Sequence, residues 1–258
     1  NWRDNLRQVE PYVPGEQPRS LDVVKLNTNE NPYPPAPGVL AALASLGADG
    51  LRRYPDPTCG VLVRELAARY GVGDDQVFVG VGSDDVLAMA FQAFFHSEKP
   101  ILFPDITYAF YPVWAELFGI PYQTPALDAQ FRLVKEDYYQ PNGGIVFPNP
   151  NAPTSIGEPR AFVEDVVAHN PDSVVIVDEA YVDFGGESAL PLVSRYDNLL
   201  VVQTFSKSRS LAGLRIGFCI GSPELIQALN AVKYSFNSYT LNEPALVLGT
   251  ASLREEAY

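Results

Sequence analysis

Four stretches in the second half of the chain are apolar at consecutive positions, at residues 144–147, 174–177, 199–202 and 216–220. Continuous apolar character is typical of strands whose two faces are both covered, as in a parallel sheet flanked by helices. A shorter apolar run at residues 77–79 predicts a further strand nearer the N-terminus. These runs are expected to form one central sheet.

Between the strands, apolar residues recur at helical spacing. Thr58 is the expected N-cap of one helix, and a second helix starts at Ser222-Pro223-Glu224, where a capping hydroxyl, a proline and an acid follow one another. The alternation predicts an α/β fold with a mainly parallel central sheet and helices on both faces. Helices are expected at residues 39–46, 58–70, 84–95, 159–168 and 241–253 and near residue 112.

The same patterns divide the chain into three parts. Residues 1–30 are expected to form an N-terminal arm, residues 31–240 a large domain, and residues 241–258 the start of a smaller C-terminal domain that is largely absent. The first residues are polar, and no stretch approaches the roughly 18 apolar residues of a membrane helix. We therefore expect a cytoplasmic protein that binds no membrane.

Composition narrows the classes of partner. The chain has 18 Lys and Arg against 31 Asp and Glu, and its formal net charge of −13 argues against nucleic acid or anionic membranes, which require a basic face. It has two cysteines and two histidines, so neither a disulfide framework nor a metal site is expected. Small anionic molecules remain candidate ligands, because a few well-placed basic groups are enough to bind them.

In open parallel sheets, ligands bind beyond the carboxyl ends of the strands, so the polar residues that follow each strand are candidates for chemistry. After the first strand, residues 80–85 (Gly-Val-Gly-Ser-Asp-Asp) open a helix, and their glycines and free N–H groups suit a phosphate. A simple capped helix explains them equally well. Asp85 stands at the last glycine position of GxGxxG, which argues against a Rossmann-type dehydrogenase.

Asp178 follows a buried strand, where a carboxylate is costly without a partner. It is either a helix cap or an anion that keeps a cationic ring nitrogen protonated. Lys207 follows the next strand amid hydroxyls and is either an ordinary exposed lysine or an amine activated by burial. In the second case Arg215 and Ser206 suit a phosphate. An aromatic residue within 106–111 suits stacking on a flat cofactor, although core packing is the commoner role.

Together these segments resemble the fold-type I pyridoxal 5′-phosphate (PLP) aminotransferases, and most closely the histidinol-phosphate aminotransferase family. The similarity runs over nearly the whole chain and keeps the family's order of segments. Its most specific parts are residues 26–32 (LNTNENP), 53–56 (RYPD), 82–85 (GSDD), 178–181 (DEAY) and 204–207 (TFSK), with Arg215.

The resemblance implies PLP as the cofactor and a role for each matching residue. Lys207 is implied to bind the cofactor covalently and to move the proton during catalysis. Asp178 is implied to pair with the ring nitrogen and Tyr181 to hydrogen-bond the ring's phenolic oxygen. Tyr108 is implied to stack on the face of the ring.

The resemblance also implies how the cofactor phosphate is held. The main chain at Ser83 and Asp84 is implied to bind it, together with Ser206 and Arg215. Thr204 is a further candidate for this end of the cofactor.

Three more residues are implied to act on the substrate or across subunits. Tyr12 and Asn29 are implied to contact the substrate. Tyr54 is similar to a residue that reaches the phosphate of the neighbouring subunit, so a homodimer is expected.

The chain departs from the family's pattern in two places. The family's Asn-Asn-Pro-Thr-Gly segment is NAPTS here, at residues 151–155, so Ala152 replaces the asparagine that bonds the cofactor and Asn151 becomes the candidate for that role. The C-terminal domain, which supplies an arginine for the substrate carboxylate, is missing over about a hundred residues.

The implied reaction transfers an amino group between small molecules. Histidinol phosphate donates it and leaves as imidazole-acetol phosphate, and 2-oxoglutarate, a 2-oxo acid, accepts it and becomes glutamate. An aromatic aminotransferase or an amino-acid-phosphate decarboxylase would share the cofactor site. A non-catalytic binding protein on the same fold is a third alternative, but an intact Lys207 with Asp178 favours catalysis.

Overall fold

The computed structural model describes residues 2–18 and 22–258, and these form a seven-stranded sheet in the order β1-β7-β6-β5-β4-β2-β3. β2 to β6 run parallel, whereas β7 is antiparallel to both of its neighbours, β1 and β6. The predicted mainly parallel sheet is confirmed. The strands are β1 (Val77–Gly80), β2 (Ile101–Leu102), β3 (Tyr122–Gln123), β4 (Ile145–Pro148), β5 (Val175–Asp178), β6 (Leu199–Thr204) and β7 (Gly217–Ile220).

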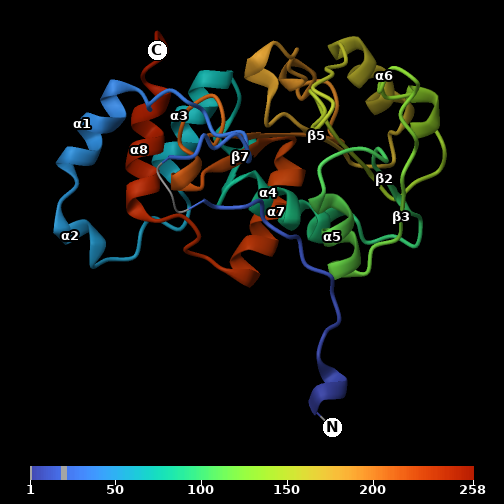
Figure 1. Ribbon diagram of the computed structural model, residues 1–258, viewed down its shortest axis with the longest axis horizontal. Helices are drawn as coiled ribbons and strands as arrows, with labels where there is room; N and C mark the ends of the chain where they lie inside the picture. The colour runs from blue at the N-terminus through green and yellow to red at the C-terminus, as the bar shows by residue number, and fades with distance from the viewer. Residues whose placement is uncertain (1, 19–21) are drawn as a thin grey trace.

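Helices cover both faces of the sheet (Figure 1). The predicted helices are all present, with ends shifted by only one or two residues. Helices α1, α3, α6 and α8 pack on one face, and α4, α5 and α7 pack on the other. The helices are α1 (Pro37–Ser45), α2 (Ala48–Leu51), α3 (Gly60–Tyr70), α4 (Ser83–Phe94), α5 (Phe110–Phe118), α6 (Arg160–His169), α7 (Pro223–Phe236) and α8 (Glu243–Leu253).

Each inner strand sends alternate side chains into two separate cores. In β5, Val175 and Val177 pack with the first group of helices, whereas Ile176 packs with the second, and all three are fully buried. Both faces of the strand must therefore be apolar, which explains its continuous apolar sequence.

Two local predictions need correction. Cys59, with a φ of 53°, holds the N-cap position of α3, so the prediction of Thr58 is wrong by one residue. The Asp56 carboxylate takes the capping role, because it accepts hydrogen bonds from the backbone N–H groups of Thr58 and Gly60 at 2.9 and 2.8 Å. The other correction concerns β2 and β3, which the sequence did not predict. Each strand is only two residues long, which is too short to show a periodic pattern.

The two ends of the chain differ in how they pack. The arm leaves the body beside α5 (Figure 1), and residues 1 and 19–21 of the predicted arm lie outside the described residues. α8 packs on α1 and α3 and contributes Leu246 and Leu253 to their core, while the predicted domain boundary at residue 240 stays a prediction. No helix in the described part of the chain has the length and apolar character that a membrane span needs.

Candidate active site

A cavity of about 910 Å³ opens at the carboxyl ends of β4, β5 and β6, between the start of α4 and the N-terminal arm. Residues far apart in the sequence meet there because parallel strands end at the same edge of the sheet. The predicted site residues that line this cavity are Tyr12, Asn29, Ser83, Asp84, Tyr108, Asp178, Tyr181, Thr204, Ser206, Lys207 and Arg215.

The Asp178 carboxylate lies at the end of β5 and is 5% exposed. Its Oδ2 accepts a hydrogen bond from the Tyr111 hydroxyl at 2.9 Å, and its Oδ1 accepts one from the Ala180 N–H at 3.1 Å. Burial raises the pKa of Asp178 to about 6, and the Tyr111 hydrogen bond opposes that rise. The site therefore holds a carboxylate that gains from a cationic partner.

The Lys207 amine belongs to the turn that follows β6 and lines the same cavity. Its Nζ donates to the carbonyl oxygen of Thr28 at 2.7 Å and lies 5.4 Å from the centre of the Tyr181 ring. The Asn31 side chain donates to the carbonyl oxygens of Lys207 and Ser208, which fixes the turn that carries the lysine. The amine is thus held in a defined position within the cavity.

A third part of the cavity is suited to an anion. Arg215 Nη1 lies 3.5 Å from Ser206 Oγ, and Ser206 Oγ accepts from Thr204 Oγ1 at 2.9 Å. Ser83 opens α4, and the first N–H groups of a helix lack partners within it and attract anions. A Cβ on Gly217 would lie 2.2 Å from the Gly82 carbonyl carbon and from the Ser83 nitrogen, so only glycine permits this approach of β7.

Asp84 connects the aromatic wall of the cavity to this anion site. Its Oδ1 accepts from the Tyr108 hydroxyl at 2.8 Å, and its Oδ2 lies 3.4 Å from Arg215 Nη2. Burial, reinforced by the charge of Asp84, raises the pKa of Tyr108 well above its usual value. Tyr108 therefore stays a neutral hydrogen-bond donor.

The remaining wall comes from the arm and the segment after it. Asn29 Nδ2 donates to the Tyr181 hydroxyl at 2.9 Å. The Tyr12 ring stacks on Phe110 with a centroid distance of 4.2 Å. Both predicted substrate contacts thus lie beside the predicted cofactor residues.

Comparison with known proteins decides the family. Residues 21–257 match the family model described as aminotransferase class I and II. A histidinol-phosphate aminotransferase of Methylococcus capsulatus is 59% identical over 97% of this chain and 70% of its own length. One from Dechloromonas aromatica is 56% identical over the whole chain and 73% of its own length. The chain belongs to the class I and II aminotransferases, in the histidinol-phosphate aminotransferase family.

Solved structures agree on the fold. The histidinol-phosphate aminotransferase of Sinorhizobium meliloti in complex with PLP has a TM-score of 0.81 and 23% identity, over 90% of this chain and 64% of that one. The enzyme from Clostridium acetobutylicum has a TM-score of 0.79 and 21% identity, over 90% of this chain and 69% of that one.

PLP is the cofactor of this aminotransferase, and the residues present fit it. A buried carboxylate, Asp178, suits the ring nitrogen, and Lys207 supplies an amine in the same cavity. Arg215, Ser206 and the start of α4 suit the phosphate.

Two predicted residues of the aminotransferase lie away from the cavity. Tyr54 is 81% exposed, and its ring packs on Tyr239 at 4.6 Å. Asn151 is buried; its Oδ1 accepts from Thr107 Oγ1, and its Nδ2 donates to the Ile106 carbonyl and to Thr154 Oγ1. The structure does not bring Asn151 to the cavity, and Ala152 lines it instead.

Sequence reasoning missed two groups that touch the predicted catalytic pair. Tyr111 donates to Asp178, but in the sequence it is one of several aromatic residues at the start of a helix. The Thr28 carbonyl accepts from Lys207, and a main-chain group leaves no sequence signal except that its residue lies in the matching 26–32 segment.

Proposed function

We propose that this aminotransferase transfers the amino group of histidinol phosphate to 2-oxoglutarate, giving imidazole-acetol phosphate and glutamate. The observation that carries the proposal is that Lys207 and Asp178 line one cavity together with Tyr12 and Asn29. Relatives with the histidinol-phosphate name are 54–59% identical, which supports this amino donor over others. We further propose that the enzyme acts in histidine biosynthesis, in the cytoplasm.

Each residue has a defined task in this reaction. Bound PLP acts as an electron sink for the substrate. The Lys207 amine, positioned by the Thr28 carbonyl, would take the proton from the substrate Cα and deliver it to the cofactor carbon C4′. Asp178 holds a proton at the ring nitrogen, and its burial strengthens that electrostatic interaction.

The two remaining walls orient cofactor and substrate. Tyr181 is positioned by Asn29 to donate to the ring's phenolic oxygen. Tyr108, held by Asp84, packs on the ring face, while Arg215 binds the phosphate. Ordered groups of this kind accelerate reactions by fixing geometry in advance.

We also propose that the active assembly is a homodimer in which Tyr54 completes the partner's phosphate site. Tyr54 is exposed and does not line its own cavity, which supports this assignment because an aromatic residue so exposed gains from an interface. The small-molecule substrates enter each subunit's own cavity.

The proposed reaction is tested by comparing amino donors. The purified enzyme is assayed with histidinol phosphate or phenylalanine, with 2-oxoglutarate as the acceptor. We expect kcat/KM to be about a hundredfold higher for histidinol phosphate, since a site built for a phosphate rejects donors that lack one. A preference for phenylalanine would assign an aromatic aminotransferase, and release of carbon dioxide would assign a decarboxylase.

A further inference from the structure

The N-terminal arm contacts helix α5 at two places. The Tyr12 ring stacks on Phe110, the first residue of α5, with a centroid distance of 4.2 Å. The Arg7 guanidinium donates through Nη1 to the carbonyl oxygen of Leu117, in the last turn of the same helix. The arm therefore runs along the length of α5, from its C-terminal end to the active-site cavity.

The C-terminal end of α5 is well suited to accept a cation. Gly119 adopts a φ of 69°, and its N–H bonds to the carbonyls of Ala115 and Glu116, while the Ile120 N–H bonds to Ala115. This arrangement satisfies carbonyls earlier in the turn and leaves that of Leu117 for Arg7. A guanidinium is favoured there because the end of a helix carries partial negative charge.

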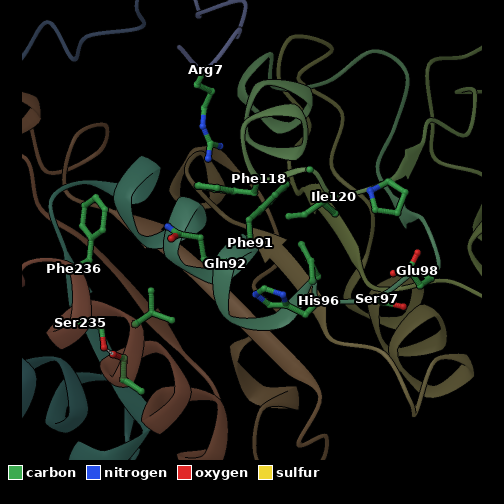
Figure 2. Close-up of a pocket in the computed structure, with 15 residues that line it drawn as sticks. Arg7, Phe91, Gln92, His96, Ser97, Glu98, Phe118, Ile120, Ser235 and Phe236 are labelled. Atoms are coloured by element: carbon green, nitrogen blue, oxygen red, sulfur yellow. Dashed lines mark hydrogen bonds between the residues drawn. The ribbon is translucent and has the colours of Figure 1, made fainter. Parts of the chain in front are cut away.

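Arg7 also lines a second cavity, of about 940 Å³, that is separate from the active site. Its other walls include Phe91 and His96 from α4 and its end, Phe118 from α5 and Phe236 from α7. Figure 2 shows the Arg7 side chain reaching from the arm toward Phe118 and Phe91. Because this cavity is open at the C-terminal end of α5, the Arg7 guanidinium can reach the Leu117 carbonyl.

We propose that Arg7 is a positioning residue, a latch that fixes the arm on α5 and so holds Tyr12 at the active-site cavity. The inference rests on the proposed function and on the implied contact of Tyr12 with the phosphorylated substrate. The arm buries little around these two contacts: Val9, which lies between them, is 45% exposed, and Val13, which follows Tyr12, is 82% exposed. With so little apolar burial, the docked state depends on the contacts at Arg7 and Tyr12.

Loss of the latch changes substrate binding more than turnover. If the docked fraction of the arm falls tenfold, the apparent affinity for substrate falls by about the same factor. Saturating substrate draws Tyr12 back to the cavity, because it binds the docked state more tightly. KM therefore rises while kcat stays close to its original value.

The latch itself is measured without substrate, by limited chymotrypsin digestion of the holoenzyme. Cleavage between Tyr12 and Val13 requires the undocked arm, so its rate follows the undocked population. We expect Arg7→Ala to raise this rate about tenfold, and Arg7→Lys, which keeps a cation, to raise it less. The matched control is Gln8→Ala, whose side chain donates within the arm, to the Leu6 carbonyl, and it is expected to leave the rate unchanged.

Steady-state kinetics then test the consequence for the substrate. Arg7→Ala is expected to raise the KM for histidinol phosphate about tenfold with kcat nearly unchanged, while Gln8→Ala matches the parent enzyme. Equal cleavage rates for Arg7→Ala and the parent would overturn the latch. Faster cleavage with an unchanged KM would overturn its positioning role. If histidinol phosphate is not a substrate, the proposed function fails, while the digestion still judges the latch.

Discussion

The carboxylate of Asp178 is 5% exposed and accepts two hydrogen bonds, yet burial still raises its pKa to about 6. Among the described residues, no cation forms an ion pair with it. The folded protein therefore holds this carboxylate at a cost to its stability. A cationic ring nitrogen beside the carboxylate would relieve this cost.

This cost predicts how the stability of the cofactor-free protein depends on pH. Because the folded state binds the Asp178 proton more tightly than the unfolded chain, the protein loses up to roughly 3 kcal/mol as the pH rises from about 4 through 6. Asp178→Asn removes this loss, so its free energy of unfolding should exceed that of the parent at pH 7.5 and match it below pH 4. Denaturant unfolding of both cofactor-free proteins at several pH values measures the difference.

Glu179 serves as an internal control for that experiment. Burial raises its pKa to about 7, but both proteins contain it, so its titration cancels from their difference. Asp178→Asn should also lower turnover of the holoenzyme a hundredfold or more. A parent and variant of equal stability at pH 7.5 would contradict the predicted cost, and near-normal turnover would refute the role as ring partner.

Tyr111 also affects the pKa of Asp178, through its hydrogen bond to the carboxylate. Tyr111→Phe removes a hydrogen bond to the Asp178 carboxylate, which should raise the Asp178 pKa further and weaken PLP binding about tenfold at pH 7. Spectrophotometric titration with PLP measures the affinity. Tyr139→Phe is the matched control, because Tyr139 donates to Asp165 far from the cavity; similar losses in both variants would rule out a specific effect.

At this scale the sequence predicts some roles and not others. Asp178 and Lys207 stand out because each follows a buried strand, where a charged group demands a reason. Tyr111 does not stand out, because its ring contributes to the core and only its hydroxyl reaches the site. The sequence also could not predict which residue takes the role of the family's asparagine, whose position Ala152 occupies here. The Asn151 side chain bonds to Thr107 because of a turn whose geometry the sequence does not specify.

Among the elements, β7 and α4 set the width of the anion site. A Cβ at Gly217 would lie 2.2 Å from the backbone of Gly82 and Ser83. β7 can therefore approach the start of α4 this closely only if residue 217 is glycine. Any larger residue must push the start of α4 away from Arg215. The anion site therefore depends on the packing of two elements, and not only on the residues that line it.

Gly217→Ala tests this dependence. The added methyl group should lower the free energy of unfolding by about 1–3 kcal/mol and weaken PLP binding at least tenfold, through displacement of Ser83. The matched control is Gly213→Ala, where an added Cβ meets nothing within 4 Å. PLP titration and denaturant unfolding are compared for both. Unchanged affinity in Gly217→Ala would show that α4 adjusts freely.

The elements themselves were largely predictable, because continuous apolar runs and helical spacing mark them. The strand order was not: nothing in the sequence shows that β7 inserts between β1 and β6. Short strands such as β2 depend on pairing with neighbours for their conformation. Register and neighbour choice come from tertiary packing, which local patterns do not encode.

At the scale of the whole molecule, the proposed dimer predicts that Tyr54 acts in the partner's site. Lys207→Ala and Tyr54→Ala subunits, each nearly inactive alone, are mixed, unfolded and refolded together. If Tyr54 acts across the interface, each mixed dimer regains one intact site, and activity should recover to about a quarter of the parent value for random pairing. No recovery above the separate variants would place Tyr54 outside the partner's site. Size measurements confirm that dimers re-form.

The position of β7 also has a consequence for how the enzyme is made. In the sheet β1 pairs with β7. During synthesis β1 therefore cannot form this pairing until residues 217–220 have left the ribosome. Until then a nascent chain has the lysine turn but no Arg215 and no wall behind Ser83. Such non-local pairing forms late in folding. The vitamin-derived ligand consequently meets a receptive pocket only once residues 217–220 have been translated, and a product truncated before them cannot sequester it.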